Sequence, residues 1–134
     1  MMRYLLDTNI CIYIIKQRPK KVIEHIRALS VGEVAVSAIT LAELEYGAAK
    51  SSRPEQNRDA LIAFTAPFEI LPFDDNASLH YGEIRASLEI SGQVIGAMDM
   101  LIAAHARSRS LTLVTNNSRE FQRVHGLVIE NWAR

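Results

Sequence analysis

The chain has one cysteine, no excess of either charge and no long apolar run, and each absence excludes a class of protein. Cys11 has no second cysteine to pair with, which excludes an internal disulfide and suits a reducing compartment. Lys plus Arg and Asp plus Glu number 15 each, so the chain lacks the overall basic field of a non-specific nucleic-acid binder. No stretch is long enough to span a membrane, and no small-residue cleavage site follows the apolar first residues. We therefore expect a cytoplasmic protein whose contacts with nucleic acid are local.

Short apolar strands alternate with helices along the 134 residues, which fit one domain, 1–134. Apolar runs at 3–6, 34–39, 111–115 and 127–130 predict strands, and the run at 68–72 ends in proline, which favours an edge strand. Helical spacing predicts helices at 10–15, 20–30, 41–49, 54–66, 76–90, 97–106 and from 117 on. In the helix at 76–90 we expect Leu79, Ile84 and Leu88 to face inward. The alternation predicts an α/β fold with a mostly parallel sheet and helices on both faces.

Four acidic residues follow a predicted strand or stand at the start of a predicted helix: Asp7, Glu43, Asp99 and Glu120. In an open parallel sheet, ligands bind outside the carboxyl ends of the strands. Neighbouring strands lie about 4.8 Å apart, so carboxylates at adjacent strand ends would crowd into one cleft. Such repulsion is relieved by protonation or by a bound cation.

Helix capping is the alternative explanation for most of these acids. Asp7 can cap the helix that follows it. Thr40-x-x-Glu43 and Asn117-x-x-Glu120 both have the spacing of a capping box, in which the acid reaches back to a backbone amide. Asp99 stands in an otherwise apolar first turn, where an unpaired buried carboxylate costs several kcal/mol unless something compensates it. Capping and cation binding both remain open at this point.

The donor types favour a hard cation. All candidate ligands offer oxygen, and no pair of the four histidines has zinc-binding spacing; they are His25, His80, His105 and His125. We expect Mg²⁺ or Mn²⁺. No serine or cysteine has a neighbouring base at motif spacing that would make it a covalent nucleophile. The pattern predicts metal-assisted hydrolysis of a phosphodiester.

Four acid-bearing segments, in this order, make the chain resemble the PIN-domain ribonucleases, and closely the VapC toxins of bacterial type II toxin–antitoxin pairs. The segments are Leu5–Asn9, Ile39–Leu44, Asp99–Ala104, and Leu113–Asn117 with Glu120–Phe121. The resemblance covers essentially the whole chain. It implies a three-layer α/β/α PIN-like domain with a five-stranded parallel sheet of order 3-2-1-4-5. It also implies Mg²⁺ or Mn²⁺ at the acidic cluster, cleavage of RNA, and neutralisation by a cognate VapB antitoxin.

The resemblance also assigns roles to residues. Asp7, Glu43 and Asp99 match the core metal ligands. Where many PIN domains have a fourth acid, this chain has Asn117, and Glu120 one turn later is the candidate substitute. The resemblance further implies that Thr8 and Asn9 hold Asp7 in place, and that Thr115 and Asn117 orient ligands or water.

Partners and substrate are expectations from the same resemblance. The helix at 10–15 is apolar on all sides, and with the helical hairpin 41–64 it could receive the antitoxin segment and form a homodimer within a larger complex; burial in the core is the alternative. The favoured RNA is a transfer RNA anticodon loop, followed by messenger RNA. DNA would be contacted only through the antitoxin. A structure-specific DNA nuclease and a non-catalytic partner-binding module are the competing hypotheses.

Overall fold

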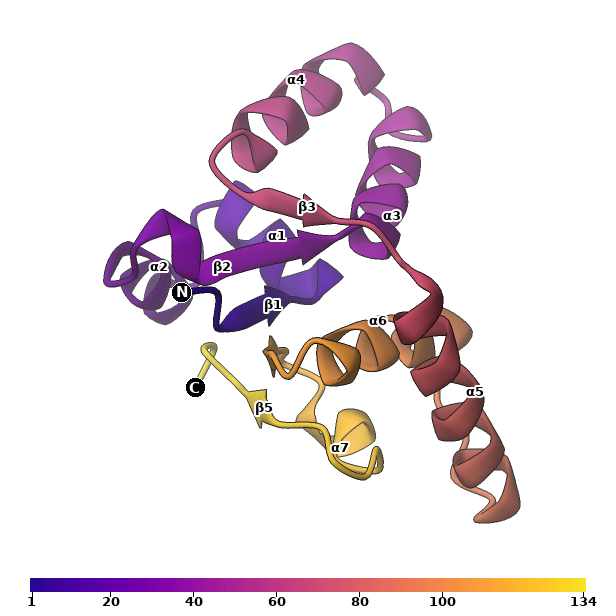
Figure 1. Ribbon diagram of the computed structural model, residues 1–134. Helices are drawn as coiled ribbons and strands as arrows, with labels where there is room; N and C mark the ends of the chain where they lie inside the picture. Colours follow the sequence, from indigo (N-terminus) through magenta and orange to yellow (C-terminus); the bar gives the residue numbers. More distant parts are fainter.

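A five-stranded parallel sheet forms the centre of the molecule in the computed structural model, which describes residues 1–134 (Figure 1). The strands are β1 (Tyr4–Leu6), β2 (Val34–Ser37), β3 (Glu69–Leu71), β4 (Thr112–Val114) and β5 (Ile129–Glu130). They pair in parallel in the order β3-β2-β1-β4-β5, which confirms the expected topology. β1 lies at the centre, so its carboxyl end has a neighbouring strand end on each side.

Seven α-helices connect the strands and cover both faces of the sheet. They are α1 (Thr8–Ile15), α2 (Lys20–Arg27), α3 (Ala38–Ala49), α4 (Pro54–Thr65), α5 (Asp75–Ile90), α6 (Ala97–Ser108) and α7 (Ser118–Phe121), with a short 3₁₀ turn at Val31–Glu33. Alternate side chains of β1 enter different cores: Leu5 packs with residues of α5, α6 and α7, whereas Tyr4 and Leu6 pack with residues of α1 to α4. The three-layer α/β/α arrangement is therefore confirmed.

Two local predictions differ from the structure. β2 ends at Ser37, earlier than expected, because the Ser37 hydroxyl accepts the backbone N–H of Ile39 at 3.0 Å and caps α3 there. Leu79 is exposed, since the buried face of α5 passes through Ala77, Ile84 and Leu88 instead. Among the helices, none combines the length and the apolar character that a transmembrane span requires.

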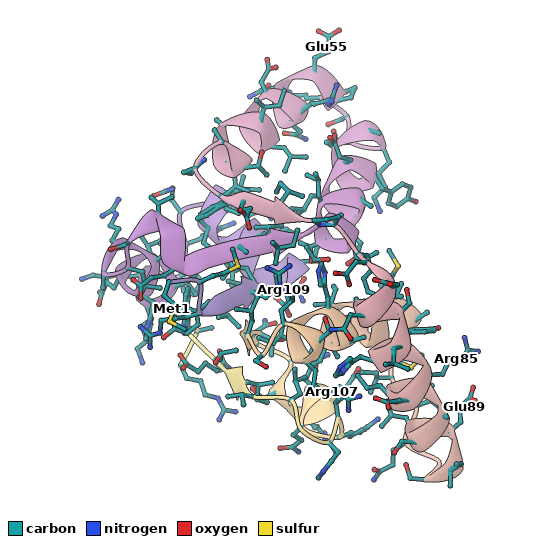
Figure 2. All side chains as sticks on the ribbon, viewed as in Figure 1. Met1, Glu55, Arg85, Glu89, Arg107 and Arg109 are labelled. Carbon is teal, nitrogen blue, oxygen red and sulfur yellow. The ribbon has the colours of Figure 1, made fainter.

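Arg107 on α6 ties together the layer that contains α5, α6 and α7 (Figure 2). Its guanidinium donates to His80 Nδ1 at 2.8 Å and to Glu83 Oε1 at 2.9 Å, both on α5. It also donates to the carbonyl oxygen of His125 at 3.0 Å, in the segment after α7. By contrast, Arg85 and Glu89 form a 3.2 Å ion pair that is exposed on the outer side of α5. Arg107 thus holds the helix that carries Asp99 against the segment that follows α7.

Trp132 closes the core on the side of α1 to α4, where it is only 2% exposed. Its ring meets Tyr4 edge-on at 5.3 Å and stacks on the exposed His25 at the same centroid distance. We expect Trp132→Ala to lower the free energy of unfolding by about 3–5 kcal/mol, because it leaves a large cavity. Urea denaturation measures this loss. Val128→Ala, at an exposed position, should change stability by less than about 0.5 kcal/mol, and equal losses in both variants would contradict this account of the core.

Candidate active site

Asp7 is the most buried of the candidate acids, with 5% of its surface exposed. It follows β1 directly, and its backbone N–H donates to the carbonyl of Val114 on β4 at 3.0 Å. Its Oδ1 accepts the backbone N–H of Ile10 at 2.9 Å, so Asp7 caps α1. The capping interpretation is therefore correct for Asp7, but the cap employs one carboxylate oxygen and leaves the other available.

The sheet register places polar residues in one row beside Asp7. Leu6 pairs with Val36 on one side and with Val114 on the other, so the next positions along the three strands are Asp7, Ser37 and Thr115. Thr115 is fully buried, and its interaction with the Asp7 side chain lowers the pKa of that carboxyl. The Thr115 hydroxyl also accepts the backbone N–H of Asn117 at 2.9 Å. Thr115 therefore links the Asp7 carboxylate to the loop that leads to α7.

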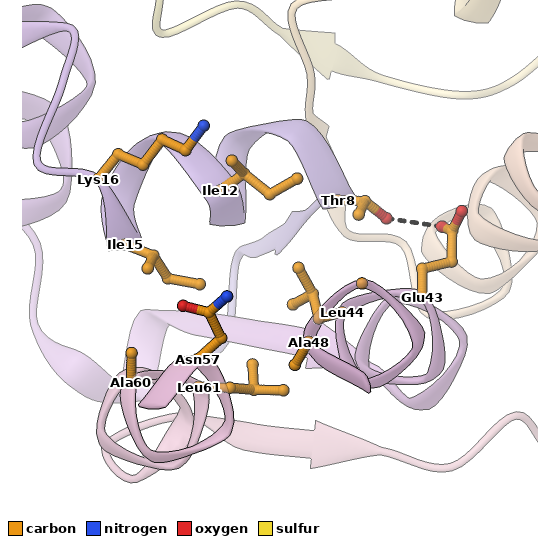
Figure 3. Close-up of a pocket in the computed structure, with 11 residues that line it drawn as sticks. Thr8, Ile12, Ile15, Lys16, Glu43, Leu44, Ala48, Asn57, Ala60 and Leu61 are labelled. Atoms are coloured by element: carbon orange, nitrogen blue, oxygen red, sulfur yellow. Dashed lines mark hydrogen bonds between the residues drawn. The ribbon is translucent and has the colours of Figure 1, made fainter. Parts of the chain in front are cut away.

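Glu43 enters the site from the middle of α3. The Thr8 hydroxyl donates to Glu43 Oε1 at 2.7 Å, which joins the first residue of α1 to α3 (Figure 3). The capping box predicted for Thr40 and Glu43 is wrong, because Ser37 caps this helix and Glu43 lies beyond the first turn. Thr8 contacts Glu43 rather than Asp7, whereas the exposed Asn9 has no side-chain hydrogen bond.

Asp99 and Glu120 stand in the first turns of α6 and α7. Gly96 precedes α6, and a Cβ atom at that position would lie 3.3 Å from Asp99 Oδ2, so the missing side chain leaves room for this carboxylate. Asn117 begins α7 but makes no side-chain cap, and the capping box predicted for Asn117 and Glu120 is absent. Neither acid is therefore occupied in capping its helix.

The four acids act on one another electrostatically. The pKa of Asp7 is raised from 3.8 to about 6, chiefly by burial and then by the negative charges of Asp99 and Glu43, against the opposing effect of Thr115 and the Ile10 amide. The pKa of Asp99 is also raised, chiefly by burial and then by Glu120 and Glu43. Asp7 and the acids on α3, α6 and α7 therefore share one electrostatic cluster.

The donor chemistry of this cluster fits a hard divalent cation. Its members are carboxylates with hydroxyl and amide groups nearby. A cation would relieve the repulsion that, after burial, contributes to the raised pKa values of Asp7 and Asp99. In this arrangement no three acidic, histidine or cysteine side chains converge closely enough to share one ion. Binding would thus require the carboxylates to draw together.

Two contacts near the site could not be foreseen from sequence spacing. Asn116 donates to the Tyr13 hydroxyl at 2.7 Å across 103 residues of sequence. His105 Nδ1 lies 2.7 Å from Ser37 Oγ, 68 residues apart. Neither pair belongs to a recognisable motif, because each depends on how separate elements pack.

An apolar groove opens beside the acidic cluster, between α1, α3 and α4 (Figure 3). It encloses about 310 Å³, and Ile12 and Ile15 of α1 face Leu44, Ala48 and Leu61 across it. Its polar lining includes Thr8, Lys16, Glu43 and Asn57. Because Glu43 belongs to both, the groove and the acidic cluster share a border.

Comparisons with known proteins agree with this geometry. Residues 4–127 match the family model of the PIN domain. The chain is 47% identical over 133 residues to the "tRNA(fMet)-specific endonuclease VapC" of Shigella flexneri, across 99% of this chain and 100% of that protein. It is 45% identical over 132 residues to "Ribonuclease VapC2" of Rickettsia felis, across 98% of each.

Solved structures resemble the fold over its full extent. One is VapBC2 from Rickettsia felis bound to a DNA fragment from its promoter, with a TM-score of 0.92, 44% identity, and coverage of 98% of this chain and 99% of that chain. Another is DNA-bound VapBC from Salmonella typhimurium, with a TM-score of 0.93, 44% identity and the same coverage.

The raised pKa of Asp7 predicts how stability depends on pH in the metal-free protein. The folded-state pKa of about 6 exceeds the unfolded value near 3.9, so Asp7 favours folding at low pH and this contribution is lost as the pH rises from about 4 to 6. Asp7→Asn keeps an oxygen for the α1 cap and removes the charge. We expect it to be more stable than the unsubstituted chain at pH 7, by up to about 3 kcal/mol, with the difference shrinking toward pH 4.

Urea denaturation between pH 4 and pH 7.5 in the presence of EDTA measures this difference. Asp59→Asn, which neutralises an exposed carboxylate on α4, should follow the unsubstituted protein throughout. The prediction fails if Asp7→Asn is the less stable protein at pH 7.

Proposed function

Because the chain belongs to the PIN-domain family and, within it, to the VapC ribonucleases, we propose that it is a Mg²⁺- or Mn²⁺-dependent endoribonuclease, the toxin of a toxin–antitoxin pair. The observation that carries the proposal is the electrostatic cluster of Asp7, Glu43, Asp99 and Glu120 at the carboxyl ends of the strands. Capping accounts for only one carboxylate oxygen of this cluster, on Asp7. The remaining negative charge needs a cation.

Each side chain of the site has a distinct task in this proposal. Asp7, Glu43 and Asp99 hold the ion, and Glu120 completes the set in place of the acid that Asn117 replaces. When bound, the ion supplies positive charge that polarises the scissile phosphodiester and stabilises the leaving oxygen. Thr8 orients the Glu43 carboxylate, and Thr115 orients that of Asp7. Asn117 stands at the start of α7 and is proposed to orient water.

The proposed substrate is a transfer RNA, cut in its anticodon loop. One relative at 47% identity is named a tRNA(fMet)-specific endonuclease, which makes the initiator transfer RNA the first RNA to test. A single-stranded loop can present its phosphodiester to a half-buried cluster, whereas a paired helix cannot. The ribonuclease names of the relatives also favour RNA over DNA as the substrate.

The proposed partner is a VapB-type antitoxin, and the groove between α1, α3 and α4 is its proposed binding site. Both similar structures are VapBC complexes bound to DNA, so we propose that DNA is reached through the antitoxin. An apolar segment with an acidic group could fill the space between Ile12 and Leu61 and meet Lys16 at the rim. A homodimer of this chain within a larger complex is part of the same proposal.

We expect Asp7→Ala to lower Mg²⁺-dependent cleavage of initiator transfer RNA by at least about 100-fold, the scale on which removal of one electrostatic catalytic group acts. It should also relieve growth arrest when the toxin is expressed. Circular dichroism and a thermal midpoint equal to or above that of the unsubstituted chain would show that the variant is folded. Full activity in a folded Asp7→Ala protein would overturn the site assignment.

Glu120→Ala should be less severe than Asp99→Ala, because Asp99 is a proposed core ligand whereas Glu120 compensates for Asn117. Cleavage rates measured across a Mg²⁺ titration separate the two variants. We expect Glu120→Ala to regain part of its rate at high Mg²⁺ and Asp99→Ala to stay inactive. Equal losses that no Mg²⁺ concentration restores would instead make both acids core ligands.

Gly47→Leu tests the groove as the antitoxin seat. Gly47 lines the groove within α3, and a Cβ there meets no atom within 4 Å, so the new side chain fills the groove without disturbing the fold. We expect antitoxin binding to weaken at least tenfold by calorimetry, about 1.4 kcal/mol. Gly82→Leu, at an equally open helical position on α5, is the matched control. If both variants bind the antitoxin as the unsubstituted chain does, the antitoxin sits elsewhere.

A further inference from the structure

A buried hydrogen bond joins the two helices that carry Glu43 and Asp99. It connects Ser37, which caps α3, to His105 on α6, with 2.7 Å between Ser37 Oγ and His105 Nδ1. Both residues are fully buried. The function described above uses neither of them, although α3 and α6 each supply a proposed metal ligand.

The surrounding hydrogen bonds assign the direction of this contact. Ser37 Oγ already accepts the Ile39 N–H at 3.0 Å, so its own hydrogen is available to His105 Nδ1. Burial lowers the pKa of His105, which favours the neutral ring whose Nδ1 accepts a hydrogen bond. Phe73 meets the imidazole edge-on at 5.4 Å and fixes its orientation. The two hydrogen bonds therefore run in the same direction: the Ile39 N–H donates to Ser37 Oγ, and the Ser37 hydroxyl donates to His105 Nδ1 on α6.

The contact lies close to the acids in both sequence and space. Ser37 is adjacent to Asp7 in the row at the strand ends, since Leu6 pairs with Val36. Glu43 follows Ser37 by six residues along α3, and Asp99 precedes His105 by six residues along α6. A change in the separation of α3 and α6 at this contact therefore changes the separation of Glu43 and Asp99.

We propose that the Ser37–His105 hydrogen bond positions α3 against α6, and that it thereby sets the spacing of Glu43 and Asp99 and the affinity of the site for its divalent ion. The inference rests on the proposed function, because it presumes that these two acids share an ion. His105 and Ser37 are positioning residues in this account, since neither is a proposed ligand.

The energetics distinguish positioning from simple core stabilisation. A hydrogen bond makes only a small net contribution to the free energy of unfolding, and His105 Nε2 lacks a well-aligned partner, which reduces the benefit of a buried imidazole. An apolar side chain of similar volume could fill the same space. A hydrogen bond fixes a distance and a direction between two helices, whereas apolar contacts allow them to slide. The main effect of the Ser37–His105 hydrogen bond is therefore on the relative position of α3 and α6, and its effect on stability is smaller.

The test compares His105→Leu with His105→Asn in the full chain. Leucine fills the space without an acceptor, whereas the asparagine Oδ1 can replace Nδ1 as acceptor. Binding of Mn²⁺ in the absence of RNA is followed through the electron paramagnetic resonance signal of the free ion. We expect the dissociation constant to rise about tenfold in His105→Leu, in the range seen when supporting partners of metal ligands are removed. His105→Asn should recover most of the affinity.

Two further measurements separate positioning from loss of stability. Val22→Ala, at a fully buried position on α2, lowers stability without touching α3 or α6 and should bind Mn²⁺ as the unsubstituted chain does. In RNA cleavage at low Mn²⁺, kcat of His105→Leu should fall with little change in KM, and high Mn²⁺ should restore it. Ser37→Ala, which removes the donor and leaves the ring, replaces His105→Leu if that variant does not fold.

Unchanged Mn²⁺ affinity in folded His105→Leu, equal losses in the leucine and asparagine variants, or an equal loss in Val22→Ala would each overturn the inference and leave the proposed function intact. Absence of Mn²⁺ binding by the unsubstituted chain would overturn the proposed function, and this inference with it.

Discussion

Mutual repulsion among the carboxylates at the strand ends destabilises the fold that brings them together. Hydrogen bonds from surrounding residues hold these carboxylates in place. Asp7 is held by the Ile10 amide and by Thr115, and Glu43 is held by Thr8. The parallel register brings these groups together, because all five strands end at the same edge. The fold thus keeps negative charge in place at the expense of part of its own stability, and the proposed cation would neutralise that charge.

The groove and the acidic cluster meet at a single hydrogen bond. Thr8 and Glu43 line the apolar groove, and their contact also sets the orientation of a proposed metal ligand. A partner bound between α1, α3 and α4 would therefore lie against Glu43, a proposed metal ligand, and inhibition would need no long-range conformational change. The apolar side chains of α1 divide between two tasks: Ile10, Cys11 and Ile14 belong to the core, whereas Ile12 and Ile15 face the groove.

The sequence predicted the sheet and the proximity of the acids, because buried parallel strands are short apolar runs, Asp7 follows one directly, and Asp99 and Glu120 stand in the first turns of helices. Capping-box spacing misled at Glu43, since Ser37 ends β2 early and shifts the helix start. The capping prediction was correct at Asp7, whose side chain caps α1. The partner of Thr8, the Asn116 contact with Tyr13 and the Ser37–His105 bond depend on packing between distant segments, and no periodicity encodes them. The identity of the ion stays a prediction.

The order in which the site residues occur along the chain limits when the protein can act during its synthesis. Asp7 comes at the start, but Thr115 and Glu120 come after most of the chain, and β4 must pair with β1 before Thr115 reaches Asp7. A ribosome-bound nascent chain that stops short of these residues cannot assemble the cluster. On the proposed function, an incomplete translation product would lack the complete site, and an antitoxin would need to capture only finished molecules.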